Sequence, residues 1–508
     1  MLFRWPCHEA RSALGVGLVG FAWALVATSS RLVMGINWDT ASYVAFYASG
    51  LQGWSSPPWG AHYAVGQVYL AGHALAGAFG GTFIDGVRLA NALALGAAGY
   101  ALARATQRLA GGVGALWALL YVFAWGVAQL VMTLEDNVLY LPMATGSLAY
   151  SLGRLGRWRG RDGLVAGGLA AAGALMSWQA GLYLFVPLAA IVGFEPSRPR
   201  VRALHMLVVL ASFFGTLCAW VVAYGLTVPG PRLGALFAIL FSPPSPSFFP
   251  TSGAALRDIL GAPGRVLAHV GLGLWFEVAG RPGAVEAPSP EALWLPLLGG
   301  AAVVLAAAGT LRMCLRAKTD AEARPLAFLS VTGFAIACAT ALYVDLPLDK
   351  YKRYEFVPLF GALLGAAFTA RCKGTRTLRR FALGLVAMVA AEVLLAVAQA
   401  RTHRARLPET QPAGYAGPGH EPWFVYVRRL RRAHPEACLF TLPWHPGFVH
   451  GRYQMELPAA LWSELPAHQI VGDPAAVATW RVPVRVVPAP RLAPPRDCEW
   501  RTVDAEAP

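Results

Sequence analysis

Asp39 is the first residue of this sequence whose type and position suggest chemistry. It lies in residues 37–43, directly after the first long apolar run. A carboxylate just beyond a membrane-spanning helix lies at the water interface, where the amphipathic helix that follows it would present it. The same carboxylate is also a favourable helix N-cap, because its oxygen can accept a backbone amide hydrogen bond. Asp39 is therefore either a functional acid at the membrane surface or only a cap.

A second acidic group, Glu135-Asp136-Asn137, lies at the end of an outward apolar run with almost no loop. Acids at membrane depth are costly and are usually functional. Adjacent carboxylates repel each other and favour binding a cation or a proton. Together with Asp39, these oxygen ligands would suit Mg²⁺ or Mn²⁺, with Asp39 and Asp136 as the candidate ligands. The alternative is a solvated loop tip.

A basic group follows a late apolar run and comprises Lys350, Lys352 and Arg353, with Tyr354 beside it. The planar guanidinium fork of arginine matches phosphate, and lysine adds a point charge. This group predicts a binding site for the phosphate or pyrophosphate of a lipid. The alternative is an interfacial anchor, with long cationic side chains reaching the headgroups.

Trp178 and Gln179 occupy a tight turn between two apolar runs. An indole and an amide could line a sugar-binding site. Tryptophan is also enriched at both membrane interfaces, so Trp178 is either a substrate-binding residue or part of the aromatic belt.

The elements that must position these residues are membrane helices. The 508 residues are 56% hydrophobic and only 14% charged, with a mean hydropathy of +0.48. Soluble domains carry about 25% charged residues, so the bilayer is the expected solvent. The formal net charge of +15 does not indicate a nucleic-acid partner, because the basic residues gather in short loops between apolar runs.

The positions of the arginine clusters predict the orientation of the chain. Every second loop is rich in arginine, which places these loops and the N-terminus in the cytoplasm and residues 401–508 outside. This orientation places five acids on the outer face, namely Asp39, Glu135, Asp136, Asp345 and Asp349. The cytoplasmic arginines include Arg104, Arg108, Arg154, Arg157, Arg159, Arg161, Arg198, Arg200, Arg202, Arg312, Arg316, Arg324, Arg371, Arg376, Arg379 and Arg380.

The expected fold is an all-α polytopic protein of the inner membrane, with about eleven transmembrane helices. The first outer loop, residues 31–84, is expected to hold two juxtamembrane helices. One follows Asp39, where apolar residues recur at helical spacing, and the other covers residues 62–79.

The chain divides into residues 1–400, a transmembrane domain, and residues 401–508, a small extracytoplasmic α/β domain with strand-like pieces. Cys438 and Cys498 are the only cysteines of this tail. Because the extracytoplasmic compartment is oxidising, we predict a disulfide between them.

The layout resembles the polytopic GT-C glycosyltransferases, such as the protein O-mannosyltransferases and the aminoarabinose transferases of lipid A. The likeness covers residues 10–400, and the sequence departs from it in lacking a second acid after Asp39. Five short motifs carry it: Asp39, the proline-containing residues 57–63, Phe79-Gly80 with residues 88–93, Glu135-Asp136, and Arg353-Tyr354 with Pro358.

The resemblance implies an inverting glycosyltransferase that moves a sugar from a polyprenyl-phosphate donor to a lipid, glycan or protein acceptor at the outer face. Asp39, Glu135 and Asp136 would be the catalytic residues, and the basic group would neutralise the leaving phosphate. A transporter or flippase for a lipid-linked glycan is the alternative, although the acids lie at span ends and no internal repeat is visible. A scaffold for envelope assembly is a third hypothesis.

Overall fold

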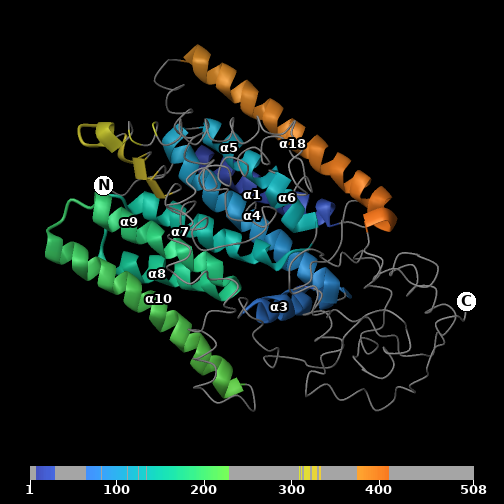
Figure 1. Cartoon of the computed structure of the whole chain (residues 1–508), viewed down its shortest axis with the longest axis horizontal. Helices are drawn as coiled ribbons and strands as arrows, with labels where there is room; N and C mark the ends of the chain where they lie inside the picture. The colour runs from blue at the N-terminus through green and yellow to red at the C-terminus, as the bar shows by residue number, and fades with distance from the viewer. Residues whose placement is uncertain are drawn as a thin grey trace, which may run out of the picture.

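The computed structural model describes residues 7–28, 40, 64–81, 83–110, 112–123, 125–132, 134–227, parts of 308–332, and 375–410. All regular elements in these residues are helical, as the apolar runs predicted (Figure 1). In chain order they are α1 (Cys7–Ala27), α3 (Val65–Gly77), α4 (Phe83–Ala110), α5 (Gly112–Phe123), α6 (Trp125–Met132), the 3-10 helix η2 (Asp136–Tyr140), α7 (Leu141–Arg154), α8 (Gly160–Met176), the 3-10 helix η3 (Trp178–Leu184), α9 (Phe185–Phe194), α10 (Pro199–Thr227) and α18 (Thr375–Thr410).

Two of the described helices are long and apolar enough to cross a membrane, over Ala10–Ala27 and Pro199–Tyr224. Shorter apolar helices cover Gly112–Phe123, Phe185–Phe194 and Ala382–Ala398. Three further apolar runs, over residues 292–311, 325–344 and 356–370, lie largely outside the described residues. The count of eleven spans therefore stays a prediction. The predicted C-terminal domain also lies outside them, apart from the end of α18.

The apolar run over residues 112–132 consists of two helices, α5 and α6, and the short helix η2 precedes α7. Pro142 lies in the first turn of α7, where its missing amide hydrogen costs nothing. The juxtamembrane stretch 62–79 contains α3, whose 13 residues span only about 20 Å. That length is too short to cross a bilayer core of about 30 Å.

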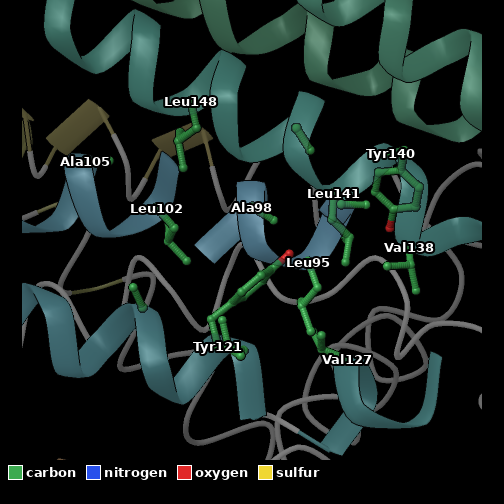
Figure 2. Packing of buried hydrophobic residues seen from close by; sticks show 14 of the residues in the cluster. Leu95, Ala98, Leu102, Ala105, Tyr121, Val127, Val138, Tyr140, Leu141 and Leu148 are labelled. Carbon is green, nitrogen blue, oxygen red and sulfur yellow. The ribbon is translucent and has the colours of Figure 1, made fainter. Parts of the chain in front are cut away.

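Helix α4 is the centre of the bundle and contacts α1, α3, α5 and α7. Figure 2 shows its buried Leu95 and Leu102 between Tyr121 of α5 on one side and Leu148 of α7 on the other. Figure 1 shows α10 and α18 along opposite sides of this core. Helix α4 also contacts η2, the short helix that begins at Asp136.

Glycines allow α1 and α4 to approach closely. A Cβ atom at Gly96 would lie 2.9 Å from the carbonyl oxygen of Gly17, and one at Gly17 would lie 3.1 Å from that of Gly96. In a lipid solvent, where helices do not gain from hydrophobic burial against each other, such close backbone packing is a main source of helix association.

We therefore expect Gly96→Leu to destabilise the bundle, because a larger side chain forces α1 away from α4. Overpacking of this kind costs about 1–3 kcal/mol. The matched control is Gly15→Leu on α1, where a Cβ atom meets nothing within 4 Å. Thermal unfolding in detergent should shift to lower temperature for Gly96→Leu only, and equal midpoints for the two variants would contradict this packing.

Candidate active site

The turn between α6 and α7 carries the two candidate acids, and it is buried. Glu135 is 1% exposed, Asp136 0% and Asn137 2%. The interpretation of this segment as a solvated loop tip is therefore wrong. Neighbouring elements cover the turn, as the contacts of η2 with α4, α6 and α8 show. Burial of two carboxyl groups is costly unless polar partners compensate, so the surroundings of the turn decide what it can do.

The backbone of the turn is held in an unusual conformation. Leu134 has a φ of 51°, which a branched residue rarely adopts because its Cβ clashes with the backbone. Two backbone bonds close the turn, from the amide of Leu134 to Val131 O at 3.0 Å and from that of Glu135 to Leu130 O at 2.8 Å. Strain of this kind costs about 1–3 kcal/mol and persists where the surroundings enforce it, commonly at functional sites.

The side-chain amide of Asn137 brings the two carboxylates together. Its Nδ2 atom donates to Glu135 Oε1 at 2.8 Å and lies 3.4 Å from Asp136 Oδ1. Within the described part of the chain, Asn137 Oδ1 has no hydrogen-bond partner. The turn thus places the side chains of Glu135, Asp136 and Asn137 together, out of contact with solvent.

Asn91 of α4 contacts the same turn. Its Nδ2 atom donates to the carbonyl oxygen of Glu135 at 3.3 Å, and the side chain is fully buried. Among the described residues its Oδ1 atom accepts no hydrogen bond. Asn91 belongs to residues 88–93, but the sequence analysis assigned it no role. The available signal was an amide inside an apolar helix, which is rare without a purpose.

Thr40, which lies in the chain between α1 and α3, contacts the turn. Its Oγ1 atom donates to the carbonyl oxygen of Leu134 at 2.6 Å and lies 3.3 Å from the hydroxyl of Tyr69 on α3. Both Thr40 and Tyr69 are fully buried. Asp39 precedes Thr40 in the sequence and lies outside the described residues. The chain is therefore fixed at the acidic turn at the position that follows the predicted base.

The other predicted site residues are placed only in part. Trp178 begins η3, at the end of α8 where the amide of Ala64 donates to Leu175 O at 2.8 Å. This bond ties the start of α3 to the end of α8. The described residues do not include the basic group and the two tail cysteines, namely Lys350, Lys352, Arg353, Tyr354, Cys438 and Cys498.

Asp162 is a further buried acid, and its contacts are those of a structural residue. It is 0% exposed, accepts from Tyr150 Oη at 2.7 Å and from the amide of Arg159 at 2.8 Å, and pairs with Arg154 Nε at 3.2 Å. Both carboxylate oxygens are thus satisfied, and the residue caps α8. Asp162 lies among the predicted cytoplasmic arginines and is not a candidate for chemistry.

The ligand types at the turn fit a hard divalent cation. Carboxylate and amide oxygens are what Mg²⁺ and Mn²⁺ prefer. Asn91 and Asn137 supply Oδ1 atoms that accept no hydrogen bond from the described residues. In the described part of the chain, no cluster of three or more His, Cys, Asp or Glu residues could hold a metal. A metal site that includes Asp39 and Asp136 stays a prediction.

No protein-family model and no curated protein matches the sequence. Several solved structures resemble the chain. The oligosaccharyltransferase AglB from Archaeoglobus fulgidus, in complex with an inhibitory peptide and a dolichol-phosphate, is 13% identical with a TM-score of 0.45. ArnT from Cupriavidus metallidurans, bound to undecaprenyl phosphate, is 13% identical with a TM-score of 0.46. The arabinofuranosyltransferase AftD from Mycobacteria is 15% identical with a TM-score of 0.39.

The extent of these likenesses differs. They cover 79%, 92% and 85% of this chain, but 58% of AglB, 90% of ArnT and 29% of AftD. The chain thus spans little more than half of AglB. These similar structures are GT-C glycosyltransferases, the class named by the sequence resemblance. At TM-scores below 0.5 the likeness assigns no residue and no substrate to this chain.

Proposed function

We propose that this protein is an inverting glycosyltransferase that transfers a sugar from a polyprenyl-phosphate donor to a lipid, glycan or protein acceptor at the outer face of the membrane. Residues 1–400 would carry the reaction, with residues 401–508 as an extracytoplasmic domain. Membrane lipid surrounds the first part, and the proposal involves no nucleic acid.

The observation that carries the proposal is the hydrogen bond from Thr40 to Leu134 O. Two acidic motifs, separated by almost a hundred residues, were each selected from the sequence as candidates for one site. The bond joins the residue after Asp39 to the residue before Glu135-Asp136. A loop with a free carboxylate at its tip would not need to be fixed in this way against a buried acidic turn.

In the proposed reaction, the carboxylate of Asp39 accepts the proton of the acceptor's hydroxyl or amine. The acceptor atom forms a bond to the anomeric carbon as the bond from that carbon to the phosphate oxygen breaks. The lipid phosphate leaves with the electron pair, and displacement from the opposite side inverts the centre. Lys350, Lys352 and Arg353 would stabilise the charge on the leaving phosphate.

Glu135 and Asp136 would orient the acceptor, and Asp136 would be the residue to share a divalent cation with Asp39. Such a cation, when bound, would stabilise negative charge near the reacting atoms. Tyr354 and Trp178 would contact the donor, the first beside the phosphate group and the second through its indole face.

Purified protein incubated with undecaprenyl-phosphate sugars should release undecaprenyl phosphate, detected by mass spectrometry, and should transfer the sugar to an added acceptor mixture. The transporter alternative has a different result in vesicles, because the labelled lipid would change leaflet with its sugar still attached. Movement of intact donor without cleavage would reject the glycosyltransferase.

The orientation is tested separately. A reporter enzyme that is active only outside the cytoplasm should be active when fused after Pro508 and inactive when fused at Arg157, because the arginine clusters hold their loops inside. Activity of the Arg157 fusion, with an inactive fusion at Pro508, would reverse the topology and move every candidate site residue to the cytoplasmic face.

A further inference from the structure

We infer that Thr40 and Tyr69 are positioning residues, whose hydrogen-bond chain holds the backbone of the acidic turn at Leu134 and so sets the direction of the Glu135 and Asp136 side chains. The catalytic consequence rests on the proposed function. The mechanical part of the inference, that these hydroxyls hold the turn in place, does not depend on it.

The direction of the hydrogen bonds follows from the atoms involved. Thr40 Oγ1 lies 2.6 Å from the carbonyl oxygen of Leu134, which can only accept. The single hydroxyl hydrogen of Thr40 is therefore used in this bond. The Tyr69 hydroxyl, 3.3 Å away, must then donate to Thr40 Oγ1. The result is a directed chain from Tyr69 through Thr40 to Leu134.

This chain joins three segments that are distant in the sequence. Thr40 is 29 residues from Tyr69 and 94 from Leu134, so it connects the first outer loop, α3 and the turn. All three side chains are fully buried. In such surroundings an unpaired hydroxyl or carbonyl costs about 1–3 kcal/mol, which favours keeping Thr40 hydrogen-bonded to the turn.

The place of contact is the strained position of the turn. Thr40 holds the carbonyl of Leu134, the residue with positive φ, and Asn91 holds the next carbonyl, that of Glu135. Two side chains from different elements thus fix consecutive peptide groups immediately before Asp136. Fixing these groups sets the direction in which the acidic side chains leave the backbone.

A displacement of about 1 Å at a reacting centre can cost on the order of 10²-fold in rate. Thr40 is the residue next to the proposed base, and its bond ends next to the acids proposed to orient the acceptor. Loss of that bond should therefore disturb turnover without removing a group that touches either substrate.

The test uses the full-length protein in detergent and the variants Thr40→Val, Tyr69→Phe and Thr40→Ser. Thr145→Val is the matched control, because Thr145 is a buried threonine whose hydroxyl bonds to carbonyls of its own helix, Leu141 O at 2.8 Å and Pro142 O at 3.4 Å. The readouts are hydrogen–deuterium exchange of the peptide covering residues 134–140 and steady-state turnover of undecaprenyl-phosphate sugars.

Thr40→Val should speed exchange in residues 134–140 about tenfold, since one buried carbonyl loses its partner. Its kcat should fall about 10- to 100-fold, while KM for the donor changes less than about twofold. Tyr69→Phe should show both effects in weaker form. Thr40→Ser keeps the hydroxyl, so its exchange rate and kcat should equal those of the parent.

The inference would be overturned if Thr40→Val had the same exchange rate and the same kcat as Thr145→Val. Faster exchange with unchanged kcat would overturn the positioning role and leave only a structural bond. If the parent protein turns over no donor, the proposed function fails, and the exchange comparison still decides whether the hydroxyl chain holds the turn.

Discussion

Asp39→Asn should insert and fold like the parent and lose turnover by about 10²–10⁴-fold, the usual contribution of a general base. Asparagine keeps the size of aspartate and caps a helix about as well. The substitution therefore removes the ability to accept a proton and leaves the structural role in place. Turnover is measured as release of undecaprenyl phosphate, and insertion as yield and monodispersity of the purified protein.

Glu135→Gln and Asp136→Asn are the comparison for this experiment. Both acids are buried and share the amide of Asn137. If they only orient a ligand, their substitution should reduce turnover less than substitution of the base. If Asp39→Asn kept parental turnover and Asp136→Asn lost it, Asp136 in the turn would be the base. Parental activity of all three variants would leave the enzyme without its chemistry and favour transport.

Arg353→Ala should raise KM for the donor lipid more than Arg353→Lys does. Lysine keeps the positive charge but cannot form the two parallel hydrogen bonds that a guanidinium makes to phosphate. Charge-assisted bonds contribute about 1.5–3 kcal/mol each, so we expect roughly a 10- to 100-fold rise for alanine. The measurement is initial rate against donor concentration.

The double variant Lys350→Ala and Lys352→Ala should also raise the donor requirement. A matched control is Arg198→Ala, because Arg198 is an exposed arginine from a loop predicted to face the cytoplasm. If the donor KM is unchanged in all the outer-face variants, the basic group is an interfacial anchor, as the alternative interpretation holds.

The sequence by itself indicated a helical membrane protein and identified its candidate acids. Hydropathy and helical periodicity are local properties of the chain, so they predicted membrane helices and the juxtamembrane stretch that contains α3. The clustering of arginine is likewise readable along the chain and predicts the orientation. Asp39 and Glu135-Asp136 stood out because acids are rare in such a sequence.

Only the tertiary structure decided how the acidic turn is placed. From the sequence, residues 135–137 could also have been a solvated loop tip. The packing of α4 and its neighbours buries the turn instead. The tertiary structure also identified Thr40 and Asn91, to which the sequence had assigned no role. Their roles come from hydrogen bonds across 94 and 44 residues of chain. Such contacts depend on how distant helices meet, which no local pattern of residues specifies.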